Sequence, residues 1–163
     1  MPTSAAVITV SDRSSSGERP DTSGPIAVAA LREAGYDCAD AAIVPDGADS
    51  VERALRAALA AGARVIVTTG GTGVAPRDQT PEGTLPVLHR PIPGIAEELR
   101  RRGAEHVASA VLTRGVAGIA ASDAGGALVV NLPGSTGGVR DGMPVIIELA
   151  PHVLDQLGGG DHR

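Results

Sequence analysis

Short apolar runs alternate with longer amphipathic segments along the first half of the chain. Runs at 3–10, 38–44 and 64–69 are rich in Val, Ile and Ala and predict buried strands. Ala- and Leu-rich segments at 23–35 and 49–62 carry apolar faces at helical spacing, and each ends at a glycine. This strand–helix order predicts a mostly parallel sheet that is covered by helices on both faces.

The second half of the chain repeats this pattern with one reversal. Apolar runs at 116–121 and 127–132 flank the turn sequence Ser-Asp-Ala-Gly-Gly, which predicts a hairpin and therefore one antiparallel strand. The polar segment 11–23 is predicted to be a loop, and residues from Gly158 onward are expected to fray. We expect one α/β domain over residues 1–163. The remaining helices are predicted at 95–102, 106–112 and 139–149, with a short last helix from Pro151 to Leu157.

The amino-acid composition limits the kinds of function. Hydrophobic residues make up 42% of the 163 residues, but there is no Phe, no Trp and one Tyr, so the core must be aliphatic. A nucleic-acid partner is not expected, because such proteins use stacked aromatic rings and basic surfaces, whereas this chain has a net charge of -5. All 14 Lys and Arg residues are Arg, which excludes a P-loop lysine, a Schiff base and a lysyl-nucleotide intermediate.

The cysteine and hydropathy patterns are those of a protein of the cytoplasm. The lone Cys38 cannot form an internal disulfide, and no group of Cys and His residues has the spacing of a zinc site. No apolar run is long enough to cross a bilayer, and the N-terminus lacks a signal-peptide pattern. We therefore expect no membrane partner and a cytoplasmic location.

A glycine-rich segment directly follows the strand predicted at 64–69. The three glycines of Gly70-Gly71-Thr72-Gly73 allow backbone N–H groups to turn toward a bound phosphate, and Thr72 adds a hydroxyl. The glycine spacing differs from the dinucleotide-binding fingerprint, and no helix begins at once. Anion binding is the favoured interpretation of this loop, and a plain strand-to-loop turn is the alternative.

Charged residues follow the glycine loop in the sequence Pro-Arg-Asp-Gln-Thr-Pro-Glu at 76–82. A carboxylate such as Asp78 repels an anionic ligand unless a cation bridges them, and Mg²⁺ binds through one or two carboxylates together with phosphate oxygens. Arg77 could neutralise charge on a departing phosphate. The alternatives are an Asp that stabilises the helix start at Thr80 and an Arg that lies in solvent.

Three further segments are predicted to lie at the carboxyl ends of strands. Ser11 and Asp12 follow the first strand, Asp46 follows the second, and Pro133-Gly134-Ser135 follow the hairpin. If the hairpin's second strand is parallel to the others, these segments and the glycine loop converge on one rim, where open parallel sheets bind ligands. Asp46 then becomes a second metal carboxylate, and Ser135 begins a helix whose dipole favours anions. Turn and capping roles are the alternatives for these residues.

Four motifs occur in a specific order along the chain. They are Thr69 to Gly73, Pro76 to Glu82, Pro93 to Glu97 and Asn131 to Ser135. Together they resemble the Mog/MoaB family of molybdenum-cofactor biosynthesis proteins, which includes the G domain of gephyrin, and the resemblance covers nearly the whole chain. It implies an α/β fold, namely a three-layer α/β/α sandwich with a mixed five-stranded sheet, that is usually assembled as a homotrimer.

The resemblance also implies an activity. A molybdopterin adenylyltransferase transfers AMP from MgATP to the terminal phosphate of molybdopterin and releases pyrophosphate. The two functional aspartates of the family match Asp46 and Asp78, which we expect to be catalytic and to bind Mg²⁺. Contacts to molybdopterin and ATP are expected from Ser11, Asp12, Thr69, Gly70, Gly71, Thr72, Gly73, Arg77, Thr80, Pro133, Gly134 and Ser135.

The family has two branches, and the motifs favour one of them. The segment 76–82 matches the adenylyltransferase branch, whereas Gln79 and the sequence Ser135-Thr136-Gly137 are also compatible with the MoaB-like branch. Adenylyl transfer is therefore the favoured function. The alternative is a non-catalytic, MoaB-like molybdopterin-binding or carrier protein.

Overall fold

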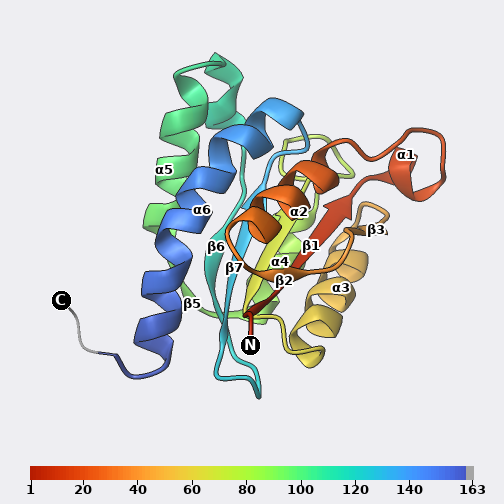
Figure 1. Cartoon of the computed structure of the whole chain (residues 1–163). Coiled ribbons are helices and arrows are strands. Elements are labelled where there is room, and N and C mark those ends of the chain that lie inside the picture. The colour runs from red at the N-terminus through yellow and green to blue at the C-terminus, as the bar shows by residue number, and fades with distance from the viewer. Residues whose placement is uncertain (161–163) are drawn as a thin grey trace.

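Seven strands form one mixed sheet in the centre of the molecule (Figure 1). The computed structural model describes residues 1–160. Along the sheet the order is β2-β1-β4-β7-β6-β5, and β3 also pairs with β1. The strands are β1 (Ser4–Val10), β2 (Asp37–Cys38), β3 (Ala42–Val44), β4 (Val65–Thr69), β5 (Leu88–Pro91), β6 (Ala117–Ala120) and β7 (Ala127–Leu132).

Among the strands of residues 1–160, β6 alone runs against the others. β1 is parallel to β2, β3 and β4, and β4 is parallel to β7, whereas β6 is antiparallel to both β5 and β7. The predicted hairpin and the single antiparallel strand are therefore confirmed. Because β1, β4 and β7 are parallel neighbours, their carboxyl ends lie at the same edge of the sheet.

Helices cover both faces of the sheet and complete three layers (Figure 1). Along β4, Val65 and Val67 pack into the cluster that α2, α5 and α6 cover, whereas Ile66 packs against α3 on the opposite face. This arrangement confirms the predicted α/β/α sandwich. The helices are α1 (Asp12–Ser15), α2 (Ser23–Glu33), α3 (Ala48–Ala60), α4 (Thr80–Thr84), α5 (Pro93–Ala104) and α6 (Thr136–Leu157), and the 3₁₀ helices are η1 (Leu85–Val87) and η2 (Ala108–Leu112).

The edges of the sheet differ from the prediction. The sheet has seven strands rather than the five that the resemblance implied. The segment predicted as one strand at 38–44 forms the two short strands β2 and β3, because residues 39–41 do not pair. Strand β5 was not predicted, since its sequence Leu-His-Arg-Pro is mostly exposed and its register with β6 is irregular. A short polar edge strand lacks the alternation that marks a strand in a sequence.

Helix α6 is continuous where two helices were predicted. Pro144 and Pro151 both lie inside it. A proline removes a backbone hydrogen bond from a helix, but the buried residues Val145, Ile146 and Ala150 hold α6 against its neighbours. Packing against the core therefore decides the course of this helix.

Smaller differences concern the ends of elements. The predicted loop at 11–23 contains the short helix α1, and α2 begins at Ser23 rather than being capped by it. Gly158 caps α6, so the fraying predicted from this residue onward is not seen at Gly158 itself, and residues 161–163 lie outside the described part of the chain. No helix within residues 1–160 is long and apolar enough to cross a membrane.

Candidate functional site

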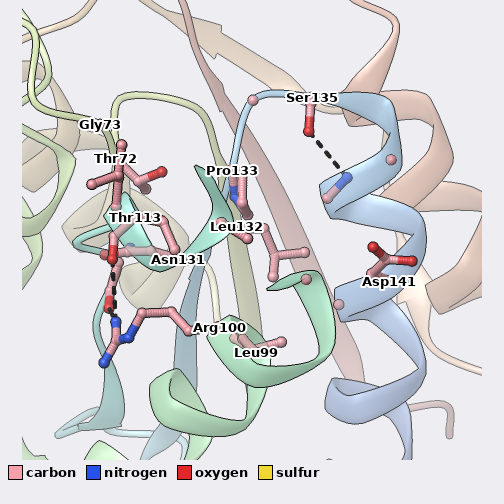
Figure 2. A pocket seen from close by; sticks show the side chains of 18 of the residues that line it. Thr72, Gly73, Leu99, Arg100, Thr113, Asn131, Leu132, Pro133, Ser135 and Asp141 are labelled. Atoms are coloured by element: carbon pink, nitrogen blue, oxygen red, sulfur yellow. Dashed lines mark hydrogen bonds between the residues drawn. The ribbon is translucent and has the colours of Figure 1, made fainter. Parts of the chain in front are cut away.

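Two adjoining cavities lie at the carboxyl ends of β1, β4 and β7. The polar cavity, of about 390 Å³, is bounded by the segments that follow β1 and β3, and the large cavity, of about 820 Å³, lies between the glycine loop, α5, η2 and α6. Figure 2 shows the large cavity, with Thr72 and Gly73 on one side, Ser135 on the other, and Leu99 and Arg100 of α5. The residues that line both cavities are Gly70, Gly71, Asp78, Gly134 and Ser135, which we call the shared rim.

The glycine loop at 70–73 has its carbonyl groups turned toward the protein. Gly70 and Gly71 have φ angles of 92° and 68°, which favour glycine. The Thr80 hydroxyl donates to the Gly70 carbonyl at 2.8 Å, and the Thr80 N–H donates to the Gly71 carbonyl at 3.0 Å. Within residues 1–160, no protein acceptor is found for the N–H groups of Gly71, Thr72 and Gly73. These groups are thus left available to an anion.

A buried hydrogen-bond network holds Thr80 in place beneath the glycine loop. The Asn131 side chain donates to the hydroxyls of Thr68 and Thr84 at 2.9 and 3.0 Å, and the Thr84 hydroxyl donates to the Thr80 carbonyl at 2.7 Å. Asn131 also accepts from the Val116 N–H at 3.1 Å. All three threonines are fully buried. The position of the loop is therefore fixed from the core, since a broken bond here would leave a buried polar group unpaired.

The start of α6 supplies a second set of backbone N–H groups. Ser135 is the N-cap, and its hydroxyl accepts from the Gly138 N–H at 3.0 Å. The Ser23 hydroxyl donates to the Gly134 carbonyl at 2.6 Å and fixes the turn before the helix. An added Cβ at Gly134 would lie 3.3 Å from the Cα of Gly70, so the two amide-bearing segments pass close together. The helix dipole adds partial positive charge on the same side.

Asp46 lies at the wall of the polar cavity and is coupled to Asp12. The Asp12 N–H donates to Asp46 Oδ2 at 3.0 Å, and the Asp46 N–H donates to Asp12 Oδ1 at 3.1 Å. Burial raises the pKa of Asp46, and the charges of Asp12 and Asp78 raise it further. Asp46 and Asp78 both line the polar cavity.

Arg77 forms an ion pair with Asp12 and lines neither cavity. Its guanidinium donates to both carboxylate oxygens of Asp12 at 3.0 and 2.9 Å, and to the Asp46 carbonyl at 3.0 Å. The hydrogen bonds from Arg77 lower the pKa of the Asp12 carboxyl. This planar two-point pair joins the segment after the glycine loop to the turn that carries Asp46.

Asp78 is held by the turn in which it lies. The Ala75 N–H donates to Asp78 Oδ2 at 3.1 Å, and the Asp78 N–H donates to the Ala75 carbonyl at 3.0 Å. Oδ1 of Asp78, like Oδ1 of Asp46, accepts no hydrogen bond from residues 1–160. Within the same residues no group of three or more His, Cys, Asp and Glu side chains could hold a metal ion. A metal here would have two carboxylates and would need further oxygens from its ligand.

The structure brings together most of the predicted site residues. Thr69 also lies at this site, and its buried hydroxyl has no hydrogen-bond partner within the described residues. The predicted residues on the polar cavity are Ser11, Asp46, Thr69, Gly70, Gly71, Asp78, Gly134 and Ser135, and those on the large cavity alone are Thr72, Gly73 and Pro133.

Three predicted contact residues line neither cavity. Asp12 and Arg77 bond to each other, and Thr80 is fully buried under the glycine loop. Their polar atoms are engaged by protein groups, and their contact with ligand stays a prediction. They hold the residues that do line the cavities.

The outer wall of the large cavity was not predicted from the sequence. Arg100 of α5 donates to the carbonyls of Thr113 and Gly115, at 3.3 Å each, and η2 forms the wall beside it (Figure 2). Asn131 lies in a motif that was quoted, yet its buried network was not foreseen. None of these contacts has a local signal, since each joins residues that are far apart in the chain.

The family of the chain follows from comparison with known proteins. A model of the family described as "Probable molybdopterin binding domain" matches residues 6–152. The chain belongs to this family. The predicted family resemblance is thereby confirmed for most of the chain.

Other members of the molybdopterin-binding-domain family align over most of their length. A protein of Pyrococcus furiosus named molybdopterin adenylyltransferase is 40% identical over 149 residues, which are 91% of this chain and 87% of that protein. Molybdenum cofactor biosynthesis protein B of Escherichia coli K12 is 36% identical, over 90% of this chain and 84% of that protein. The solved Mog protein from Mycobacterium ulcerans is 43% identical, with a TM-score of 0.88 over 98% of this chain and 99% of that chain.

Some relatives are longer than this chain. It matches two molybdenum cofactor biosynthesis bifunctional proteins, from Synechococcus elongatus and Chlorobaculum tepidum, at 38% and 34% identity. The matches cover 97% and 96% of this chain but 48% and 49% of those proteins. The chain thus spans about half the length of these two relatives.

Proposed function

We propose that this chain is a molybdopterin adenylyltransferase of molybdenum cofactor biosynthesis, which transfers AMP from MgATP to the terminal phosphate of molybdopterin and releases pyrophosphate. The observation that carries the proposal is the shared rim, where free N–H groups of the glycine loop and the Asp78 carboxylate separate two cavities. Two reactants that occupied the two cavities would meet there. The identity of 40% to a protein named molybdopterin adenylyltransferase supports this reaction.

The reaction needs positioning and charge stabilisation rather than an enzyme nucleophile. A phosphate oxygen of molybdopterin attacks the α-phosphorus of ATP, a new P–O bond forms, and the bond to the bridging oxygen of pyrophosphate breaks. N–H groups of Gly71, Thr72 and the α6 start would bind phosphate oxygens and absorb the charge that develops on them. No lysine is required, in agreement with a chain in which every basic side chain except His is Arg.

The residues present fit a divalent cation such as Mg²⁺. Asp46 and Asp78 both line the polar cavity, and each has one carboxylate oxygen that accepts no hydrogen bond from residues 1–160. Two carboxylates completed by phosphate oxygens and water form a usual Mg²⁺ environment. When bound, the ion would offset the charge on the phosphates. Asp46 and Asp78 would hold the ion through these two carboxylates.

Pyrophosphate release tests the proposal. The protein should release pyrophosphate from ATP only when molybdopterin and Mg²⁺ are both present. The variant Asp78→Asn should fold as the parent does and lose this activity. Full turnover by Asp78→Asn would remove the metal-binding role of this carboxylate.

A MoaB-like carrier is the second candidate function. It is supported by the identity of 36% to molybdenum cofactor biosynthesis protein B. Such a protein would bind molybdopterin in calorimetry but would show no pyrophosphate release with MgATP. The two assays on one preparation therefore distinguish the candidates.

We also propose that the chain forms a homotrimer and acts as a single molybdopterin-binding domain. Exposed apolar side chains on and beside η2, namely Val107, Val111 and Leu112, are compatible with a protein contact. Sedimentation equilibrium at micromolar concentration tests the assembly, and a monomer would refute it. The cytoplasmic location stays a prediction.

A further inference from the structure

We infer that Arg114, which no motif of the sequence singled out, is a positioning residue that sets the place of Asp78 at the shared rim. Its guanidinium lies across the mouth of the turn that joins Gly73 to Asp78. Nε donates to the Gly73 carbonyl at 2.8 Å, and Nη2 donates to the Asp78 carbonyl at 2.7 Å. One planar side chain therefore ties the two ends of this turn together. The inference deepens the proposed function and rests on it for the role of Asp78.

Two further contacts fix the guanidinium itself. Nη1 forms an ion pair with Glu82 of α4, with a shortest distance of 2.8 Å. The Arg114 N–H donates to the Thr72 carbonyl at 2.8 Å, so its backbone is joined to the glycine loop as well. Arg114 thus connects the segment before β6 to the glycine loop, to Asp78 and to α4. Neither Lys nor a neutral residue can make this fork of bonds, because only guanidinium presents several donors in one plane.

The direction of the side chain separates positioning from ligand binding. Thr113 and Gly115 line the large cavity, but Arg114 between them lines neither cavity. The side chain of Arg114 is 38% exposed, and all three of its guanidinium nitrogens are engaged by protein oxygens. Arg114 therefore reaches substrate only through the residues that it holds.

The turn at 73–78 has few bonds of its own and is held from outside by Arg114 and by the Arg77–Asp12 pair. Its residues 74–77 are exposed, and within the described residues its internal bonds are those between Ala75 and Asp78. Loss of the Arg114 fork would release the Gly73 and Asp78 carbonyls together. The Asp78 carboxylate would then sample several positions, and a displacement near 1 Å at a reacting centre lowers a rate by about 100-fold.

The test compares Arg114→Lys with Arg101→Lys. Arg101 is a control, because its guanidinium is also held by protein oxygens, here the carboxylates of Glu98 and Glu105, but lies on the exposed face of α5. We expect Arg114→Lys to lower the kcat for pyrophosphate release by about 100-fold and to leave the KM for ATP nearly unchanged. Arg101→Lys should keep both constants. Glu82→Gln, which leaves both carbonyl bonds of Arg114 in place, should keep most of the kcat.

Two readouts identify positioning as the cause. Millimolar guanidinium should restore activity to Arg114→Ala and should not affect the parent protein. Hydrogen exchange should become faster at the amides of Ala75 and Asp78 in Arg114→Lys, with no change at the amides of β4 and β7. A parent-like kcat in Arg114→Lys, or parent-like exchange at these two amides, would overturn the inference.

The exchange experiment also separates this inference from the proposed function. If the parent protein releases no pyrophosphate, the proposed activity fails, and exchange at Ala75 and Asp78 still decides whether Arg114 holds the turn. If the parent is active and Asp78→Asn is not, but Arg114→Lys retains full kcat, the inference alone fails.

Discussion

The two cavities beside the glycine loop differ in both lining and support. The polar cavity contains Asp46 and the hydroxyls of the segments after β1, and its walls are tied by the Asp12–Arg77 pair. The large cavity is walled by α5, η2 and the glycine-rich start of α6, where Leu99 and Leu112 give it an apolar side. A small charged cavity suits phosphate and metal, whereas a large and partly apolar one suits a flat ring.

Under the proposed function, we expect each cavity to bind one reactant and the chemistry to take place at the shared rim. A substitution on the rim should stop transfer altogether. A substitution in one cavity should weaken the binding of one reactant and leave the other unchanged.

Asp78→Asn should have the largest effect on adenylyl transfer, because Asp78 borders both cavities. We expect pyrophosphate release to fall by at least about 100-fold, because one of the two carboxylates proposed to hold the divalent cation is neutralised. A coupled pyrophosphate assay measures the loss, and circular dichroism checks the fold. Asp123→Asn, at an exposed position in the β6–β7 turn, is the control and should keep full activity.

Asp46→Asn should affect the polar cavity alone. The affinity for MgATP should fall by about tenfold or more, which corresponds to ~1.4 kcal/mol, because one proposed metal carboxylate is neutralised. Calorimetry should give an unchanged affinity for molybdopterin. An equal loss of both affinities would contradict the assignment of one reactant to each cavity.

Gly137→Leu should affect the large cavity alone. An added Cβ at Gly137 meets no atom within 4 Å, so the leucine side chain can extend into the cavity that this glycine lines. Molybdopterin affinity should fall by about tenfold, while MgATP affinity is kept. Stability should not fall, since replacing a helical glycine gains about 0.5–1 kcal/mol. Unchanged molybdopterin binding would place the pterin elsewhere.

Arg77→Met should have the smallest effect, on the pH dependence of stability. The pKa of Asp12 is lowered by Arg77, so the ionised pair stabilises the fold above the unfolded pKa of about 3.9, and this stabilisation is lost as the pH falls through the lower folded value. The melting temperature of Arg77→Met should therefore decline less steeply than that of the parent between about pH 5 and pH 3. Parallel curves would show that the pair contributes nothing.

The central layer of the fold was predictable because buried parallel strands have a strong local signal. Val65, Ile66 and Val67 form a continuous apolar run, and the rule that ligands bind at the carboxyl ends of strands places Asp46 beside the glycine loop. Edge strand β5 was not predictable, because its exposed sequence lacks the apolar pattern of a strand. The continuous course of α6 was not predictable, because packing against the core outweighs the helix-breaking preference of its two prolines.

The site was predictable in its backbone and less so in its side chains. Glycines that need positive φ or a close approach are visible in a sequence, as at Gly70 and Gly71. Whether Arg77 meets a ligand or Asp12 depends on a contact between residues 65 positions apart. Arg114 lies 41 positions from Gly73, and no local sequence pattern predicts the hydrogen bond between them.

A crystal structure with MgATP and molybdopterin tests the shared rim most directly. We expect the α-phosphate at the N–H groups of Gly71 and Thr72, the ion on Asp46 and Asp78, and the pterin ring in the large cavity beside α5. Both reactants in one cavity, or phosphates that leave the glycine loop untouched, would contradict this expectation.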